Sequence, residues 1–198
     1  MHTNSSRARL QQGPTPRRMM GALVATVAAA TATILVFTTG TASAAVPTVG
    51  LGTAESFAVL AGQTVTNTGP STISGDLGVS PGTAVVGFPP GSVNNGVIHA
   101  ADAVALQAQS DLTTAYNDAA GRTPATVASV DLGGQTLAPG IYKADSTLGL
   151  TGTVTLDAEN DPAAVFIFQV GSSLITAPNS TVAMIRGANP CNVFWQIG

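Results

Sequence analysis

The stretch Gly152–Gly171, GTVTLDAENDPAAVFIFQVG, decides how the rest of the chain is interpreted. Threonines alternate with apolar residues in its first half, a turn follows at Asp161-Pro162, and an apolar run ends it. The pattern returns 27 or 28 residues later, where FIFQVG becomes VFWQIG and Asp161-Pro162 becomes Asn189-Pro190. Short strand-like runs that repeat at this period favour a parallel β-helix, because each coil stacks on its neighbour. A β-sandwich is the alternative, but the chain lacks a series of hairpin dipeptides between its strands.

The N-terminal region differs from the rest of the chain. Residues 1–18 contain four arginines and no acid, an apolar run follows from Met19 to Phe37, and Ala42-Ser43-Ala44 comes next. This order predicts a secretory signal peptide over residues 1–44, cleaved after Ala44. An uncleaved membrane anchor is the alternative, since the apolar run is long enough to span a bilayer. The many Thr and Ala residues and the A-x-A site favour cleavage, which leaves one secreted, extracellular domain over residues 45–198.

The charge of this domain excludes one class of function. After Ala44 the chain has three basic and ten acidic residues, so its formal net charge is −7. A nucleic-acid-binding protein needs basic side chains to neutralise phosphates, so that class is excluded. Cys191 is the one cysteine, which rules out an intramolecular disulfide. Its apolar neighbours Val193 and Phe194 predict a buried, unreactive thiol.

Two blocks of short strands, Phe57–Gly91 and Ala128–Gly198, are separated by a helical pattern. We predict a helix over Val97–Ala120, capped by Asn94 or Asn95 and ended by Gly121. Its apolar stripe is rich in alanine, so the helix is expected to lie close against a sheet. The residues of the stripe are Ala101, Val104, Ala105, Ala108, Leu112, Ala115, Tyr116 and Ala119.

The sequence offers little material for catalysis. His99 is the one histidine after Ala44, and we expect it to be a structural or surface residue. No HExxH motif or paired cysteine indicates a metal site. Most acids lie in turns or on the polar side of the helix, and the DAENDP segment lacks the EF-hand pattern for calcium. We therefore predict no catalytic residue and no metal, and a carbohydrate-cleaving enzyme with two converging carboxylates is the least favoured reading.

The threonines are the candidate site. Threonine is common in strands, and this preference explains most Thr-rich strands. A sharper interpretation is a flat, uncharged lattice of methyl and hydroxyl groups, spaced by about 4.8 Å between coils and about 6.7 Å along a strand. Such a lattice can hold ordered water of the kind that an ice surface would match. The candidates, chosen by their alternation along the strands, are Thr64, Thr66, Thr68, Thr151, Thr153 and Thr155.

Several long motifs together resemble one family. They include FAVLAGQTVTNTGPSTISGDLGVSPG, IHAADAVALQAQSDLTTAYNDAAGR, LAPGIYK and NPCNVFWQIG. Over Val49–Gly198 the chain resembles the microbial ice-binding-like family, which includes secreted antifreeze proteins of bacteria, fungi and algae. The resemblance implies a right-handed parallel β-helix of triangular cross-section, with a long α-helix packed along one side and one flat face that adsorbs to ice. Family domains normally continue past NVFWQIG, so the domain over 45–198 is expected to lack C-terminal coils.

Two functions from different classes follow. The first is a secreted, monomeric, non-enzymatic ice-binding protein, whose partner is the ice surface with its ordered water and which inhibits ice growth and recrystallisation. The resemblance implies no cofactor, and we expect no membrane contact after signal cleavage. The alternative is an extracellular structural or adhesive β-helix module that binds polysaccharide or cell-surface components. Sugar stacking needs exposed aromatics, whereas Phe166, Phe168, Phe194 and Trp195 are expected to lie mainly in the core.

Overall fold

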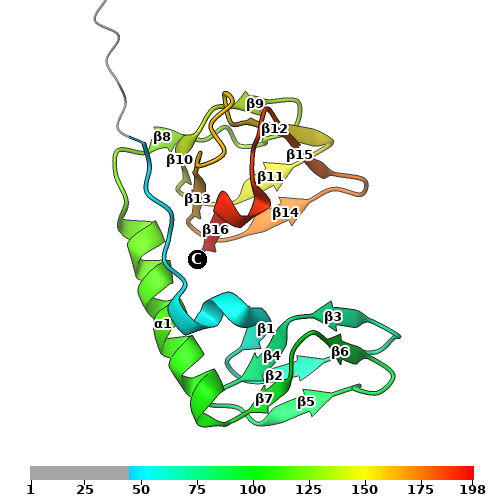
Figure 1. Cartoon of the computed structure of the whole chain (residues 1–198). Helices are drawn as coiled ribbons and strands as arrows, with labels where there is room; N and C mark the ends of the chain where they lie inside the picture. Colours follow the sequence, from blue (N-terminus) through cyan, green and yellow to red (C-terminus); the bar gives the residue numbers. More distant parts are fainter. Residues whose placement is uncertain (1–44) are drawn as a thin grey trace, which may run out of the picture. The chain divides into compact units, whose positions relative to one another are not determined.

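The computed structural model describes residues 45–198, and the predicted signal peptide over 1–44 lies outside these residues. Short parallel strands form two blocks, and one long helix, α1 (Ala103–Gly121), lies alongside both (Figure 1). The prediction of a mainly β protein, a parallel β-helix with a long α-helix packed alongside, is confirmed. Within the described part of the chain, no helix is both long and apolar enough to cross a membrane.

The first block stacks each strand on the strand one coil earlier. Its sheets have the orders β1-β4-β7, β2-β5 and β3-β6, and all pairs are parallel. The register places Thr64 beside Ala84 and Thr72 beside Ser92, twenty residues apart. The elements are η1 (Gly52–Ser56), β1 (Phe57–Ala61), β2 (Thr64–Thr66), β3 (Thr72–Ser74), β4 (Asp76–Val79), β5 (Ala84–Val86), β6 (Ser92–Asn94) and β7 (Ile98–Ala100).

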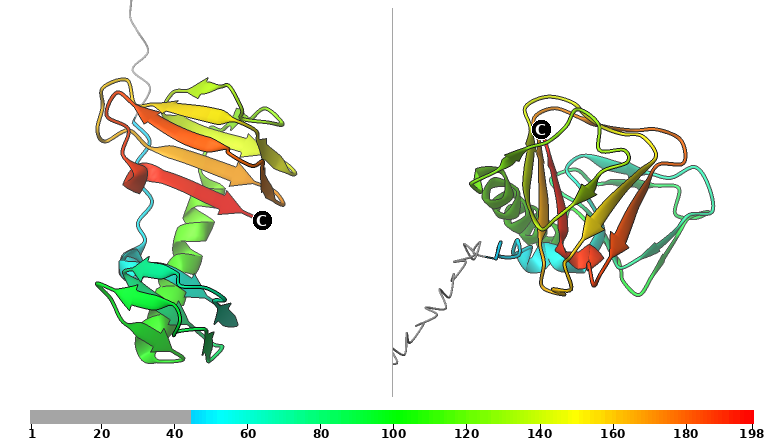
Figure 2. Two further views of the ribbon diagram at one scale, coloured as in Figure 1. Left: turned by 90° about the vertical axis from the view of Figure 1, so that its right-hand side faces the viewer. Right: turned by 90° about the horizontal axis from the view of Figure 1, so that it is seen from above.

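The second block encloses its core with three sheets, seen end-on in Figure 2. Their orders are β16-β13-β10-β8, β11-β14 and β15-β12-β9. The repeat noticed in the sequence is one coil: Thr153 pairs with Thr181, and Phe166 pairs with Val193. The elements are β8 (Thr126–Val127), β9 (Thr136–Leu137), β10 (Gly140–Ala144), β11 (Leu148–Leu150), β12 (Thr153–Asp157), β13 (Phe166–Val170), β14 (Leu174–Thr176), β15 (Thr181–Ile185), η2 (Pro190–Asn192) and β16 (Val193–Ile197).

Rows of inward-facing side chains form the core of the second block. Val154, Leu156, Phe166 and Phe168 are fully buried. The ring of Phe168 stacks on Tyr142 of the preceding coil, with centroids 5.5 Å apart, and on Trp195 of the next coil at 4.0 Å. Equivalent positions of successive coils therefore contact one another directly, as the parallel register requires. This is the structural meaning of the sequence repeat.

Helix α1 begins later than the sequence pattern predicts. The helix starts at Ala103, where the Asp102 side chain accepts a hydrogen bond from the backbone N–H of Ala105, so neither Asn94 nor Asn95 is its cap. The preceding residues 98–100 form strand β7, which continues the ladder of β4. Strand pairing overrides the helical spacing there, because Ile98 lies beside the buried Leu77. Gly121 is the last helical residue rather than the first beyond the helix.

The alanine-rich stripe packs against the β-helix as predicted. Ala105, Ala108, Ala115 and Ala119 are buried, whereas Val104 and Tyr116 lie exposed at the edge of the stripe. The helix contacts strands of both blocks.

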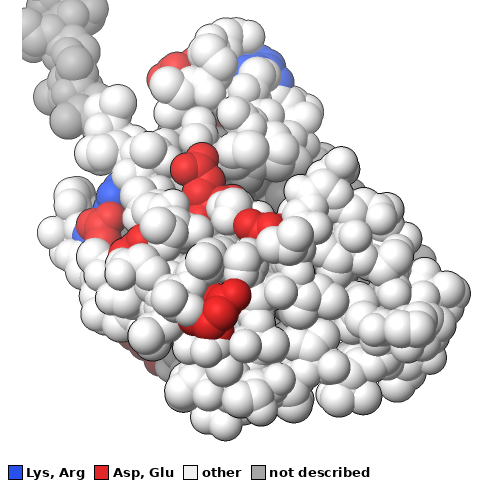
Figure 3. Space-filling model, turned by 60° about the horizontal axis from the view of Figure 1, so that its bottom comes forward, with Lys and Arg blue, Asp and Glu red and all other residues white. Residues whose placement is uncertain are grey.

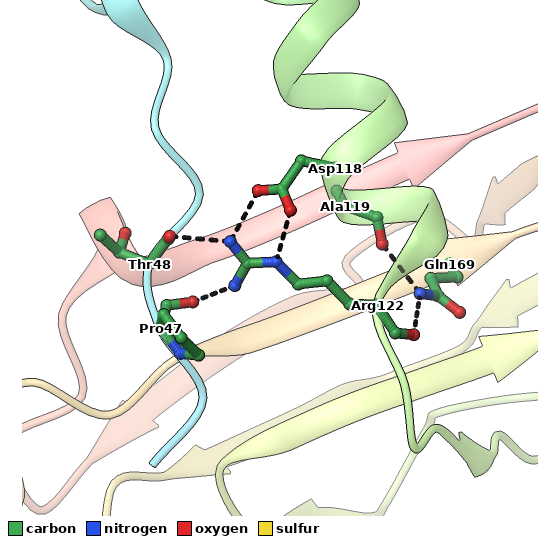
Figure 4. Close-up of polar contacts among 6 residues, drawn as sticks. All are labelled: Pro47, Thr48, Asp118, Ala119, Arg122 and Gln169. Carbon is green, nitrogen blue, oxygen red and sulfur yellow. Dashed lines mark hydrogen bonds and ion pairs between the residues drawn. The ribbon is translucent and has the colours of Figure 1, made fainter. Parts of the chain in front are cut away.

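A polar cluster fixes the C-terminal end of α1 (Figure 4). The Gln169 side chain of β13 donates hydrogen bonds to the carbonyls of Ala119 and Arg122. Arg122 pairs with Asp118 and donates to the backbone carbonyls of Pro47 and Thr48, so it also ties down the N-terminal segment.

Candidate functional site

Two of the candidate threonines lie on the first block. Thr64 and Thr66 are exposed on β2, while Val65 between them is half-buried, so the alternation inferred from the sequence is present. Their register partners on β5 are Ala84 and Val86, both also exposed. The Thr64 hydroxyl donates a hydrogen bond to the Ala84 carbonyl at 3.2 Å, which links the two coils. This surface consists of small, uncharged side chains.

Two further candidates lie on β12, the central strand of the sheet β15-β12-β9. Thr153 is exposed and pairs with exposed Thr181. Half-buried Thr155 lies between exposed Thr136 and half-buried Ala183. Val154 and Leu156 alternate with these threonines and are fully buried. Sequence reasoning did not select Thr136 and Thr181, although the 28-residue repeat relates Thr181 to Thr153.

The last two candidates lie in loops. Thr68 is exposed between β2 and β3, and Thr151 is exposed between β11 and β12. The Thr151 hydroxyl donates to a carboxylate oxygen of Asp131 at 3.0 Å, and its backbone N–H donates to the other oxygen at 3.1 Å. The six threonines are therefore not brought together: β2 and β12 belong to different sheets, and the Thr151 hydroxyl is engaged by an acid.

Charge is distributed unevenly over the chain. Residues 57–101, which form β1 to β7, contain one charged side chain, Asp76. In Figure 3 acidic side chains gather over part of the surface, and a broad adjoining area carries no charge. On the sheet β15-β12-β9 the one charged residue is Asp157, at the end of β12. Arg186 binds it through two hydrogen bonds of 2.6 and 2.5 Å, which lower the pKa of the Asp157 carboxyl.

The carboxylates serve as hydrogen-bond acceptors in turns and at the helix. Backbone N–H groups of Gly133 and Thr151 lower the pKa of Asp131, and the N–H of Thr53 lowers that of Asp111. The N–H of Ala105 lowers the pKa of Asp102, whose other oxygen lies 2.6 Å from Nδ1 of His99. A glycosidase general acid requires the opposite shift. Across residues 45–198 no group of three His, Cys, Asp or Glu residues could hold a metal.

The expected place of His99 in the helix and the expected burial of Cys191 are both wrong. His99 lies on β7 rather than at the start of the helix, and its ring packs against Phe57 with centroids 5.6 Å apart. Cys191 is exposed, not buried. It lies in the short helix η2, where its backbone N–H donates to the side chain of Asn189. Because Cys191 lies in this turn, before β16 begins at Val193, its side chain does not take part in the inward and outward alternation of the strand.

Comparison with known proteins identifies the family. The sequence model of the Ice-binding-like family matches residues 59–198. The chain belongs to the Ice-binding-like family. A relative, the ice-binding protein of Nostoc sp. (strain HG1), is 54% identical over 149 residues, which cover 75% of this chain and 55% of the relative. The ice-binding protein of Colwellia sp. is 33% identical over 74% of this chain and 63% of its own length.

Solved structures of ice-binding proteins share the fold of this Ice-binding-like chain. One from an Antarctic biological consortium has a TM-score of 0.76 and 48% identity, covering 78% of this chain and 71% of that protein. One from the Antarctic ascomycete Antarctomyces psychrotrophicus has a TM-score of 0.73 and 39% identity, covering 76% and 74%. The chain spans little more than half the length of the Nostoc relative.

Proposed function

We propose that this protein adsorbs to ice through an uncharged, threonine-bearing sheet surface and thereby inhibits ice growth and recrystallisation. The observation that carries the proposal is the in-register array on the sheet β15-β12-β9. Thr153 and Thr181 form one row, and Thr136, Thr155 and Ala183 form the next. Adjacent strands lie about 4.8 Å apart and residues i and i+2 about 6.7 Å apart, so methyl and hydroxyl groups form a regular lattice.

The chemistry of this array suits adsorption to ordered water. The threonine methyl groups pack against the water layer, while the hydroxyl groups hydrogen-bond to it. Charged side chains would disturb that order, and the one acid of the sheet, Asp157, is neutralised by Arg186 at the end of the strand. The parallel ladder holds the backbone of these strands rigid, and the branched threonine side chains have few χ1 rotamers. Little conformational entropy is therefore lost when this surface binds.

The surface formed by β2 and β5 is the second candidate. It presents Thr64, Thr66, Ala84 and Val86 in register. It also lies in the stretch 57–101, which contains one charged residue. Its lattice is smaller, because two strands contribute instead of three.

The proposal includes the setting in which the protein acts. The signal-peptide pattern over residues 1–44 supports secretion, and a monomer with no enzymatic activity is sufficient for adsorption. The hydrogen-bonded acids described above support a non-enzymatic mechanism, because those with a shifted pKa are shifted downward.

Paired tyrosine variants test both surfaces. Thr153→Tyr places a bulky ring on the sheet β15-β12-β9, and Thr64→Tyr does the same on β2, while Thr113→Tyr on the exposed side of α1 is the control. Ice-crystal shape and grain growth are measured with circular dichroism on the same samples. We expect Thr153→Tyr to lose most of the activity while remaining folded. Loss in Thr64→Tyr instead moves the site to β2 and β5.

The parent protein provides the decisive control. Unshaped ice and normal grain growth with a well-folded, β-rich sample would contradict the ice-binding proposal. That outcome would favour the alternative, an adhesive module for polysaccharide or cell-surface components.

A further inference from the structure

The connection between β14 and β15 contains a three-residue motif that the proposed ice binding does not explain. Asn179-Ser180-Thr181 is the one Asn-x-Ser/Thr triplet after Ala44, and its middle residue is not proline. Such a triplet is the acceptor motif for N-linked glycosylation, in which a sugar is attached to the asparagine amide of a secreted protein. A second triplet, Asn4-Ser5-Ser6, falls within the predicted signal peptide.

The backbone of this connection forms a tight turn around Asn179. The N–H of Ser180 donates to the carbonyl of Ala177 at 3.2 Å, which closes a β-turn over residues 177–180. Asn179 is the third residue of the turn, and its φ is 62°. Glycine and asparagine both tolerate this left-handed conformation, and proline, here Pro178, is favoured at the second position. The turn therefore explains asparagine or glycine at position 179, but it does not require the side-chain amide.

Both side chains that the motif requires are accessible. Asn179 and Thr181 are exposed. Figure 1 shows the connection between β14 and β15 projecting from the side of the second block. Within the described residues neither the Asn179 amide nor the Thr181 hydroxyl takes part in a hydrogen bond, whereas the Asn189 side chain accepts one at 3.0 Å from the N–H of Cys191. The Asn179 amide is therefore available to an external reactant.

Attachment of a sugar to Asn179 leaves the hydrogen bonds of the fold intact. The turn is anchored on the preceding coil through backbone groups alone. The N–H of Ala177 donates to the carbonyl of Leu150 at 2.9 Å, and the N–H of Thr181 donates to the carbonyl of Gly152 at 2.8 Å. Substitution at Nδ2 of Asn179 changes none of these bonds, so the fold can carry the sugar without rearrangement.

We propose that Nδ2 of Asn179 is glycosylated during secretion by an oligosaccharyltransferase. The co-substrate is an oligosaccharide linked through pyrophosphate to a polyprenyl lipid. In the reaction Nδ2 attacks C1 of the first sugar, the N–C1 bond forms, and the C1–O bond to the pyrophosphate breaks. The amide gives up one proton, and polyprenyl pyrophosphate leaves. The inference rests on the secretion that belongs to the proposed function, but it is independent of ice binding.

Cell-free synthesis of the full chain with microsomal membranes tests the proposal. These membranes supply a signal peptidase, the transferase and its lipid-linked donor. We expect a translocated product that migrates as a larger species in electrophoresis. A glycosidase that cleaves between asparagine and the first sugar should remove this shift. The same treatment converts the modified asparagine to aspartate, so mass spectrometry of the peptide that contains residue 179 identifies the site.

Four variants separate this site from other attachments. Asn179→Gln removes the acceptor, and Thr181→Ala removes the hydroxyl that the motif requires, so each should abolish the shift. Thr181→Ser keeps a hydroxyl at this position and should retain the shift. Thr176→Ala is the matched control, because Thr176 is exposed on β14 and lies outside the motif. It should leave the shift unchanged.

Three results would overturn the proposal. A translocated, signal-cleaved chain without sugar would show that Asn179 is not an acceptor, and the proposed secretion would still stand. A shift that persists in Asn179→Gln would place the sugar elsewhere. A chain that does not enter the membranes at all would remove the proposed secretion and this inference with it, without bearing on ice binding.

Discussion

Gln169→Leu tests how the long helix is attached to the β-helix. The side chain is 5% exposed, and its amide donates to the carbonyls of Ala119 at 2.8 Å and Arg122 at 3.0 Å (Figure 4). These carbonyls lie at the end of α1, where no further helical N–H can reach them. Leucine keeps a similar volume but removes both donors. Each lost hydrogen bond costs about 1 kcal/mol net, so the free energy of unfolding should fall by about 2 kcal/mol.

The matched control is Gln196→Leu, one strand away in the same register. Among the described residues the Gln196 side chain makes no hydrogen bond and lines a hollow, so its replacement should cost less than about 0.5 kcal/mol. Urea unfolding followed by circular dichroism measures both variants. For Gln169→Leu the corresponding fall in Tm is about 4–8 °C for a domain of this size. Equal losses in the two variants would refute the argument that Gln169 acts by capping the helix.

Two further predictions concern the core and the acids. Leu156→Ala should lower the free energy of unfolding in urea by about 3 kcal/mol, because Leu156 is fully buried. Met184→Ala, at the paired position one coil later, should lower it clearly less. Similar losses in the two variants would mean that the coil of Met184 is as well covered as the coil of Leu156. The N–H groups of Gly133 and Thr151 lower the pKa of Asp131, so its contribution to stability is present above its unfolded pKa of about 3.9 and is lost as the pH falls through the lower folded value. The urea midpoint should therefore fall below about pH 4, and Asp131→Asn should reduce that fall; an unchanged pH profile in the variant would remove Asp131 from the cause.

The sequence predicts the class of fold because coil stacking leaves a periodic trace. Residues that face the core of one coil reappear 27 or 28 positions later, as Phe166 and Val193 do. The family motifs add the long helix and its place beside the sheets. The helix start is missed, because residues 98–100 satisfy a helical spacing and a strand ladder equally well. The pairing of Ile98 with Leu77 of the preceding coil favours the strand, and this pairing joins residues that are far apart in the sequence.

The candidate site was predicted less well because alternation along a strand carries only part of the information. It distinguishes outward from inward residues, and both Thr64 and Thr153 do point outward. It does not say which of the three sheets a strand joins, because that depends on the number of residues in each turn between consecutive strands. The register shows that this number varies, with pairs 18 to 21 residues apart in the first block and 26 to 28 apart between β10, β11, β12 or β13 and the next coil.

Surface neighbours are instead related by the length of a coil. Thr153 and Thr181 share a row because they are one coil apart, and Thr155 shares a row with Thr136 for the same reason. Helix α1 interrupts this count between the two blocks, so no sequence spacing relates Thr64 to Thr153. The repeat length within each block is therefore the information that assigns a threonine to a surface. It selects Thr181, one repeat after Thr153, as a member of the proposed lattice. Thr136 lies closer to Thr155 in sequence than one repeat, so only the register of β9 on β12 assigns it to the lattice. Thr151 is set aside because its hydroxyl is bound by Asp131.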